Sequence, residues 1–313
     1  MSNSSPIIPG SGITDTPDAY NIEGRETPET RPVIPLGQKG YQDGQPRMGF
    51  FTDTTVCIGC KACEVACKEW NDVPATLMEL TGNSYDNTGA LGADSWRHVA
   101  FIEQRKPLRV QESGLEALGV PPSEDEDSFR WLMSSDVCKH CTNAPCLDVC
   151  PTGSLFRTEF GTVVVQEDIC NGCGYCVPAC PFGVLDQREG DGRVWKCTLC
   201  YDRTRDGLEP ACAQACPTDS IQFGPLDELR EKANGRLEMV HEAGVTDARL
   251  YGADEEGYGM GAFFLLLDDP EVYGLPPDPE VVTRKFESLL GPAAAAAGAL
   301  ALGIAAAFIG GAK

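Results

Sequence analysis

The stretch "CNGCGYCVPACP", residues 170–181, places four cysteines and two prolines within twelve residues. Two residues separate Cys170 from Cys173 and Cys173 from Cys176, but three separate Cys176 from Cys180. One loop with cysteines spaced by two residues can wrap three corners of a [4Fe-4S] cube, and the fourth corner is then closed from elsewhere. In the bacterial C-x2-C-x2-C-x3-C-P run the fourth cysteine ligates the other cluster of a pair. We therefore expect Cys180 to belong to a different cluster from its three neighbours.

The remaining cysteines repeat this arrangement along the chain. All sixteen lie between Met48 and Gly224, in four groups of four with none left over. The sequence "CPTGSLF" after the second group resembles "CPTDSIQF" after the fourth and, more loosely, "CPFGVLD" after the third, which indicates an internal repeat. The four groups are Cys57, Cys60, Cys63 and Cys67; Cys138, Cys141, Cys146 and Cys150; Cys170, Cys173, Cys176 and Cys180; and Cys197, Cys200, Cys212 and Cys216.

Zinc and disulfide bonds are the other uses for so many cysteines. Structural zinc usually takes two well separated CxxC pairs, whereas three of these groups end in Cys-Pro and two contain three cysteines spaced by two residues. The N-terminal sequence "MSNSSPIIPGSGITDTPD" has neither a basic nor an apolar region, so no secretory signal places the chain in an oxidising compartment. The pattern therefore favours iron–sulfur clusters over both alternatives.

The intervals between groups suggest which of them share a unit. Nineteen residues separate Cys150 from Cys170, and sixteen separate Cys180 from Cys197, so either interval fits within one two-cluster ferredoxin unit. The long interval from Cys67 to Cys138 suggests that the first group pairs with a distant one. The favoured arrangement is nested: the second and third groups form an inner unit at about residues 134–190, and the first and fourth form an outer unit. Sequential pairing of the groups remains open.

Composition limits the function of the whole chain of 313 residues. The hydrophobic fraction of 42% and mean hydropathy of -0.20 suit one or two domains with a core. The net charge of -22 and isoelectric point near 4.4 argue against nucleic acid as a partner, because phosphate recognition depends on clustered Lys and Arg.

The segments that flank the cysteines complete the expected α+β organisation. Residues 1–48 are rich in proline and glycine and are expected to form an extended arm, and residues 49–224 form the cysteine-bearing domain. In residues 225–288, a small α+β extension is expected: apolar residues follow helical spacing from Leu226 to Val240, with Gly244 as a stop, and "GAFFLLLDD" at Gly261–Asp269 is typical of a buried strand.

The last segment, residues 289–313, is expected to be a transmembrane anchor. Leu289 to Ala312 contains 24 residues without a charge. At about 1.5 Å per residue such a helix reaches roughly 36 Å, enough for a hydrocarbon core of about 30 Å. Alanine and glycine dominate it, and small residues such as Gly298 and Gly303 suit close packing against a partner's helix. Flanking charges leave the side of the membrane open, and export would depend on a partner's signal.

From "VCIGCKACEVACKEWND" (Val56–Asp72) onward the sequence resembles the iron–sulfur (beta) subunit of membrane-bound respiratory formate dehydrogenases. The likeness continues through "SYDN" (Ser84–Asn87), "ADSW" (Ala93–Trp96) and the three later cysteine groups. The cysteine pattern alone is shared with beta subunits of dimethyl sulfoxide, polysulfide and nitrate reductases. The "KEWND", "SYDN" and "ADSW" context favours formate dehydrogenase.

The resemblance implies two nested bacterial-ferredoxin-like units that hold four [4Fe-4S] clusters, and it assigns their ligands. We call the four implied ligand sets cysteine sets 1 to 4. Set 1 is Cys57, Cys60, Cys63 and Cys216; set 2 is Cys67, Cys197, Cys200 and Cys212; set 3 is Cys138, Cys141, Cys146 and Cys180; set 4 is Cys150, Cys170, Cys173 and Cys176.

The resemblance also implies a function without catalysis by this chain. Four clusters would pass electrons from a large molybdenum or tungsten bis-pterin subunit, which oxidises formate, to a membrane cytochrome b or other quinone-reducing subunit. The alternative is the same role in a dimethyl sulfoxide, polysulfide or nitrate reductase, where electrons run the opposite way.

Four further side chains lie next to cysteines, where they could bind a cluster or alter its potential. His140 lies between Cys138 and Cys141, but that group already has four cysteines, so a surface position or a place beside the ligands is expected. Lys61, Lys139 and Lys196 each adjoin a cysteine, where an ammonium group would raise the potential of an anionic cluster. Ordinary solvated lysines are the alternative.

Overall fold

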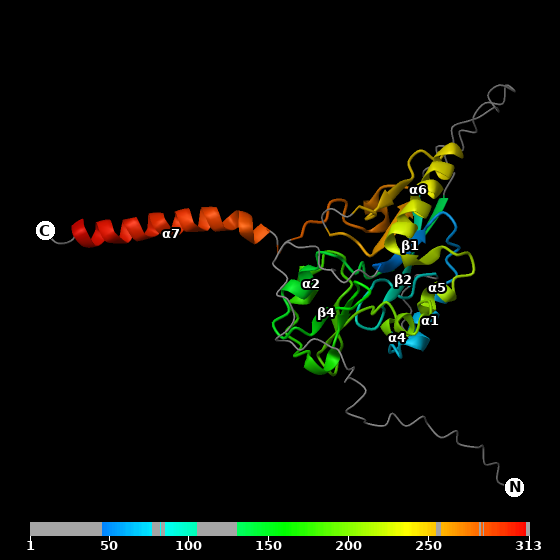
Figure 1. The fold of residues 1–313 in the computed structure, drawn as a ribbon, viewed down its shortest axis with the longest axis horizontal. Helices are drawn as coiled ribbons and strands as arrows, with labels where there is room; N and C mark the ends of the chain where they lie inside the picture. The colour runs from blue at the N-terminus through cyan, green and yellow to red at the C-terminus, as the bar shows by residue number, and fades with distance from the viewer. Residues whose placement is uncertain are drawn as a thin grey trace, which may run out of the picture. The chain divides into compact units, whose positions relative to one another are not determined.

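The computed structural model describes residues 46–76, 82, 85–104, 130–254, 258–281, 283 and 285–310 (Figure 1). All of them belong to the second of two units in the chain, Lys39–Lys313. The extended arm expected at residues 1–48 lies outside the described residues, apart from its last three.

A four-stranded sheet joins the two ends of the cysteine-bearing region. Its strands lie in the order β8 (Ile221–Pro225), β1 (Met48–Asp53), β10 (Ala262–Leu266) and β9 (Arg249–Tyr251). Strand β1 runs parallel to β10 and antiparallel to β8, so that Phe50 lies opposite Ala262 on one side and Phe223 on the other. Because β1 precedes the first cysteine group and β8 follows the fourth, the sheet brings these two groups together.

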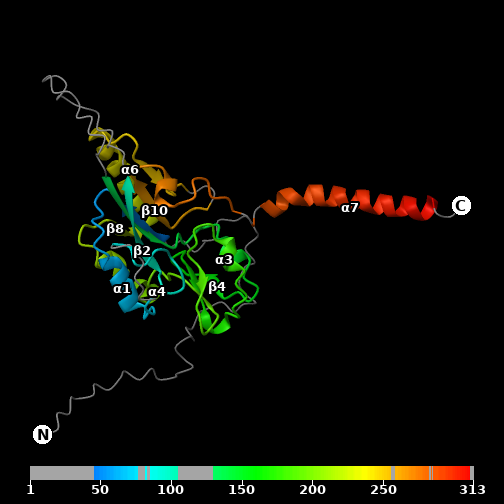
Figure 2. The same ribbon diagram turned by 180° about the vertical axis from the view of Figure 1, so that it is seen from behind.

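The two central strands of the sheet, β1 and β10, are buried on both faces, because they carry apolar residues at successive positions. Phe51, Phe263 and Leu265 form one cluster with the buried side of α6 (Leu226–Glu242). Phe50 and Phe264 belong to the other cluster, which contains the cysteines. Figure 2 shows α6 on one side of the sheet and the cysteine-bearing helices on the other. This double burial explains why residues 261–269 have the composition of a buried strand.

The cysteines lie on short helices and on the loops before them. Helix α1, which carries part of the first group, packs against α5 of the fourth, and α2 of the second group packs against α3 of the third. The described elements of this region are α1 (Ala62–Trp70), β2 (Arg97–Gln104), β3 (Arg130–Val137), α2 (Pro145–Asp148), β4 (Leu155–Arg157), β5 (Val163–Val165), η3 (Glu167–Ile169), α3 (Cys176–Ala179), β6 (Asp186–Gln187), β7 (Val194–Trp195), α4 (Tyr201–Arg205) and α5 (Ala211–Gln214). Strands β2 and β3, β4 and β5, and β6 and β7 form antiparallel pairs.

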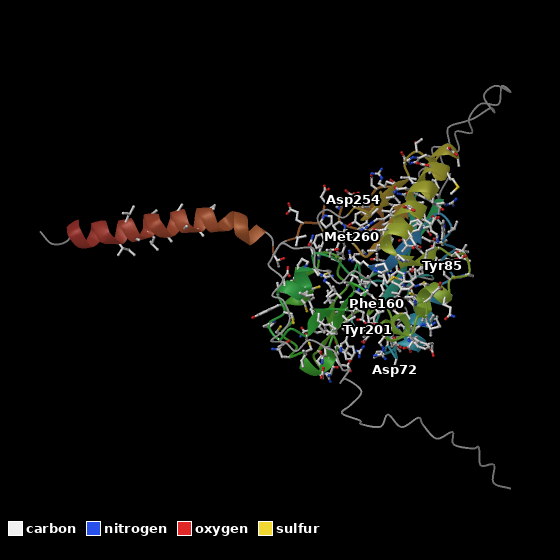
Figure 3. All side chains as sticks on the ribbon, in the orientation of Figure 1. Asp72, Tyr85, Phe160, Tyr201, Asp254 and Met260 are labelled. Atoms are coloured by element: carbon white, nitrogen blue, oxygen red, sulfur yellow. The ribbon has the colours of Figure 1, made fainter. Side chains whose placement is uncertain are left out.

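Side chains connect the part formed by the second and third groups with the part formed by the first and fourth. The rings of Phe160, in the β4–β5 turn, and Tyr201, at the start of α4, are 6.3 Å apart (Figure 3). The Tyr201 hydroxyl also donates to the Glu159 carboxylate at 3.0 Å. The two parts therefore pack as one body.

The helix and the buried strand expected after the last cysteine are confirmed. Helix α6 covers Leu226–Glu242 and buries Leu229 and Val240, and Gly244 follows its end with a φ of 93°. Strand β10 is buried at every position. Because β10 pairs with β1, residues 225–288 share a sheet with the cysteine-bearing region; η4 (Pro270–Tyr273) follows β10.

The C-terminal segment forms a helix, α7 (Lys285–Gly310), with Pro292 inside it. Within the residues described, no helix is both long enough and apolar enough to cross a membrane. The transmembrane helix expected at residues 289–313 is therefore not supported. Alanine and glycine make up most of α7, and both contribute little to the free energy of membrane insertion compared with leucine. Residues 311–313 lie outside the described part.

Candidate iron–sulfur cluster sites

The first cavity gathers cysteines from the two ends of the cysteine-bearing region. Its lining includes all four sulfurs of set 1: Cys57 and Cys60 from the loop after β1, Cys63 from α1, and Cys216 from the turn after α5. Pairing of β1 with β8 therefore brings Cys216 to the other three cysteines of set 1, although it lies more than 150 positions from them in the sequence.

The second cavity contains Cys180 together with three cysteines of the second group. It is lined by the four cysteines of set 3 together with Lys139, His140 and Tyr258. Cys180 is the C-cap of α3, and it reaches this cavity because the short helix carries the chain away from the preceding loop. Its neighbours Cys170, Cys173 and Cys176 line a different cavity with Cys150. The structure thus groups set 3 and set 4 separately.

Cys67, on α1, lies close enough to the other three cysteines of set 2 for their charges to affect it. Asn71, which follows α1, donates from Nδ2 toward the sulfurs of Cys67 at 3.8 Å and Cys200 at 3.6 Å. Burial raises the pKa of Cys67 well above its ordinary value, and the charges of Cys197 and Cys212 raise it further. All four cysteines of set 2 are buried, which is true of no other set. Cys63 and Cys67 lie one turn apart on α1, so this helix carries members of both set 1 and set 2.

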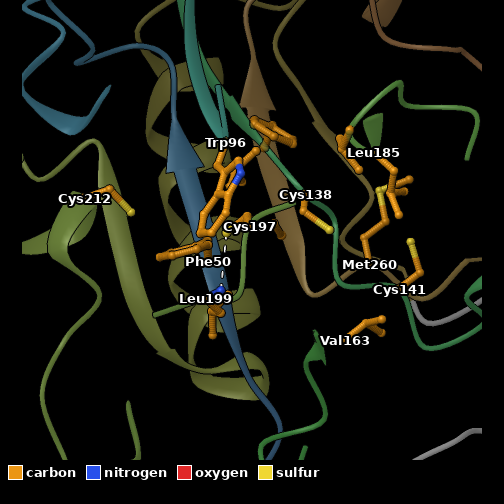
Figure 4. Close-up of a cluster of buried hydrophobic side chains, with 14 of the residues drawn as sticks. Phe50, Trp96, Cys138, Cys141, Val163, Leu185, Cys197, Leu199, Cys212 and Met260 are labelled. Carbon is orange, nitrogen blue, oxygen red and sulfur yellow. Dashed lines mark hydrogen bonds between the residues drawn. The ribbon is translucent and has the colours of Figure 1, made fainter. Parts of the chain in front are cut away.

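Left-handed backbone turns direct amide groups toward the sulfurs. His140, with a φ of 42°, donates its N–H to the sulfur of Cys138 at 3.5 Å. Leu199, with a φ of 58°, donates its N–H to the sulfur of Cys197 at 3.3 Å (Figure 4). Non-glycine residues adopt this conformation at a cost, so its recurrence next to cysteines indicates a local function.

The chemistry of these cavities suits cubane clusters. None of the sixteen cysteines forms a disulfide bond. Burial raises the pKa of Cys197 to about 12, and neighbouring cysteines add to the rise, so bound iron would have to supply the positive charge that deprotonates such thiols. Buried nitrogens of Arg97 and His140 lack a partner in the described part of the chain, and they can donate to cluster sulfur. No three Cys, His, Asp or Glu side chains among the described residues converge as the ligands of a single metal ion.

Comparison with known proteins decides the family. Two families described as 4Fe-4S dicluster domains match residues 56–154 and 129–226. A formate dehydrogenase iron–sulfur subunit of Haemophilus influenzae is 38% identical over 269 residues, which cover 83% of this chain and 80% of the relative. The iron–sulfur subunit of the nitrate-inducible formate dehydrogenase of Escherichia coli is 36% identical over 85% of both chains. The chain belongs to the family of formate dehydrogenase iron–sulfur subunits.

Membership of this family confirms the expected class of function. This iron–sulfur subunit transfers electrons within an oxidoreductase complex and is not its catalytic subunit. It carries four [4Fe-4S] clusters, in agreement with two dicluster domains and sixteen cysteines. One polypeptide of the anaerobic dimethyl sulfoxide reductase of Escherichia coli is also similar, at 35% identity over 61% of this chain and 80% of the relative.

The side chains next to the cysteines differ in their surroundings. Lys61 is partly exposed and donates to Glu64 at 2.9 Å. Lys139 and Lys196 are both 1% exposed, so the alternative of ordinary solvated lysines is wrong for these two. His140 is also 1% exposed, so a surface position is wrong for it. Burial lowers the pKa of His140 well below its ordinary value, and its Nδ1 accepts the N–H of Val163 at 3.2 Å.

Gly172, in the loop of set 4, provides a test of how tightly that loop is held. We expect Gly172→Ala to release the iron held by set 4, about four atoms of about sixteen, because a Cβ there would lie 2.5 Å from the carbonyl oxygen of Gly192. Gly153, three residues after Cys150 of the same set, has a φ of 68° against 69° for Gly172, but it has open space around it. Both substitutions incur a backbone cost of about 1–2 kcal/mol, and only Gly172→Ala adds the collision. Iron content of the two purified variants measures the difference, and equal retention of iron would contradict the prediction.

Proposed function

We propose that this iron–sulfur subunit relays electrons from a molybdenum or tungsten bis-pterin subunit that oxidises formate to a membrane cytochrome b or other quinone-reducing subunit. The observation that carries the proposal is the similarity to formate dehydrogenase subunits over more than four fifths of the chain. When bound, the clusters supply one-electron carriers of tunable potential. The chain's own residues hold them, exclude water from them and set their electrostatic surroundings.

We further propose that sets 1 to 4 are the ligands of the four clusters, in two nested ferredoxin-like units. The cavities lined by all the sulfurs of set 1, of set 3 and of set 4 support this assignment. The contacts of Asn71 with two sulfurs of set 2 support the assignment of this remaining set. Packing of α1 against α5 and of α2 against α3 supports the nesting of the outer and inner units.

A dimethyl sulfoxide reductase complex is the second candidate. Its support is the relative from Escherichia coli, which matches 61% of this chain. The formate dehydrogenase relatives match 83% and 85% of the chain, so the match extends over residues outside the shared cysteine pattern. That wider match favours formate oxidation.

Contact with the membrane is proposed to involve α7 and the membrane partner. Leu300, Leu302 and Ile304 on α7 are 66%, 73% and 50% exposed, which leaves apolar side chains for a partner to cover. Gly298 and Gly303 permit close approach of another helix. The C-terminal transmembrane anchor expected from the sequence is one version of this proposal, in which α7 spans the membrane beside the partner.

The test is electron transfer by the native complex in isolated membranes. We expect formate to reduce the membrane quinone pool, and dimethyl sulfoxide to oxidise a reduced dye no faster than a buffer control. Dye oxidation by dimethyl sulfoxide without any response to formate would favour the second candidate.

A shortened chain tests the role of α7. When cells that make a chain ending at Gly291 are fractionated, this chain should appear in the soluble fraction with its iron intact and without coupling to quinone. Retention of that shortened chain on the membrane with full coupling would contradict the role of α7.

A further inference from the structure

Among the described residues that are at most 2% exposed, two cations have no carboxylate partner. Arg97, on β2, is 2% exposed, and Lys196, between β7 and Cys197, is 1% exposed. Lys139 is equally buried, but it contacts the carboxylate of Asp136. A buried charge without a counter-charge is strongly unfavourable. The negative charge that balances Arg97 and Lys196 must therefore come from another source, and cysteine sulfurs lie next to both.

Arg97 lies between set 1 and set 2. Its Nη1 donates to the Ser135 hydroxyl at 2.9 Å, and that hydroxyl lies 3.2 Å from the sulfur of Cys63, in set 1. Burial raises the pKa of the Cys212 thiol, in set 2, and the charge of the Arg97 guanidinium opposes that rise. The guanidinium also lies 4.9 Å from the centre of the Phe50 ring, which holds it in place. Nε and Nη2 of Arg97 have no protein partner among the described residues.

Lys196 lies between set 2 and set 3. Its Nζ is 3.5 Å from the sulfur of Cys138, in set 3, and it donates to the carbonyl of Cys197, in set 2, at 2.7 Å. It also contacts the carbonyl of Val163. Figure 4 shows Cys138 and Cys197 next to one another in the buried cluster.

Set 4 has different surroundings. The residues that line its cavity include no charged side chain, and its polar members are Thr152, Ser154 and Asn171. The Ser154 hydroxyl lies 3.3 Å from the sulfur of Cys150. Set 2, in contrast, is fully buried and lies against both cations. The cations are therefore placed at two of the junctions between neighbouring sets, with set 2 common to both.

We propose that the positive charges of Arg97 and Lys196 raise the reduction potentials of the clusters next to them. Arg97 would act on the clusters of sets 1 and 2, and Lys196 on the clusters of sets 2 and 3. The inference rests on the cluster ligation proposed above. A cluster with four thiolates is anionic, and adding an electron increases its negative charge, so a nearby fixed cation stabilises the reduced form. Burial disfavours that added charge most for set 2, which accounts for its contact with both cations.

The test is a potentiometric titration of the purified complex, followed by electron paramagnetic resonance. We expect Arg97→Met to lower two of the four midpoint potentials and Lys196→Met to lower two, with one midpoint common to both variants and one affected by neither. Each shift should correspond to at least a tenfold change in the reduction equilibrium, which is 59 mV for a one-electron couple. Unchanged midpoints, or equal shifts in all four, would overturn the proposal.

Charge-conserving variants separate electrostatics from packing. Arg97→Lys and Lys196→Arg should keep the midpoints close to those of the unaltered complex, and shifts as large as those of the methionine variants would overturn the proposal. Arg130→Gln is the matched control, because Arg130 is also a largely buried cation but contacts Asp268 and no cysteine; it should move no midpoint. Loss of iron in both Arg97→Met and Arg97→Lys would make Arg97 a structural residue and overturn its assignment. An unaltered complex without four clusters would instead contradict the proposed ligation.

Discussion

Protein matured without oxygen will be brown and will contain about sixteen iron atoms and about sixteen acid-labile sulfides per chain, as four cubane clusters require. The physical reason is clearest in sets 2 and 3, where burial raises the pKa of Cys67, Cys141 and Cys197, so proton loss is unfavourable unless iron takes the proton's place. Colorimetric iron and sulfide assays, set against quantitative amino-acid analysis, measure the ratio. Stoichiometric zinc with negligible iron would contradict the assignment of the cofactors.

Refilling the emptied protein gives a control for that result. After chelation under mild denaturation, iron with sulfide should restore the colour and the cooperative unfolding transition. Zinc alone should restore neither, because no three Cys, His, Asp or Glu side chains among the described residues are grouped as the ligands of a single ion. Full recovery of cooperative unfolding with zinc would show that the cavities accept single ions.

The elements predicted from sequence are those in which local spacing reflects a local constraint. Leu226 and Val240 recur on one side of α6 because that helix packs on one face of the sheet, and the pattern alone located it. The three-residue gap before Cys180 reflects α3, a short helix that carries this cysteine to a different cavity from its neighbours. Both sequence patterns lie within a few residues of the feature that they predict.

The features that the sequence did not predict depend on contacts between distant segments. Arg97 has no cysteine neighbour in the sequence, and it reaches two cysteine sets because β2 pairs with β3, whose Ser135 lies against Cys63. Lys139 and Lys196 look alike beside their cysteines, yet Asp136 pairs with the first and no carboxylate pairs with the second in the described part of the chain. Strand β10 appeared to belong to a separate extension, and only its pairing with β1 shows the shared sheet. These distinctions arise from burial and pairing, which spacing along the chain does not record.

Replacement of Cys180 will damage the same cluster as replacement of Cys146, and a different cluster from replacement of Cys176. Cys180 and Cys146 line one cavity, while Cys176 lines another with Cys150. Alanine is the better substitution, because it has no oxygen that could take the place of sulfur. Each single variant is expected to lose one cluster, which leaves about twelve iron atoms of about sixteen.

Double variants test this prediction by the number of iron atoms retained, without any assignment of spectra to individual clusters. Cys146→Ala with Cys180→Ala should still retain about twelve iron atoms, because both changes remove ligands from one cluster. Cys176→Ala with Cys180→Ala should retain about eight, although these two cysteines are only four positions apart in the sequence, because two clusters are then incomplete. If the first pair lost two clusters and the second pair only one, Cys180 would share its cluster with the loop that precedes it. The x3 spacing before Pro181 would then have no bearing on the ligand sets, and the nesting of the two ferredoxin-like units would fail with it.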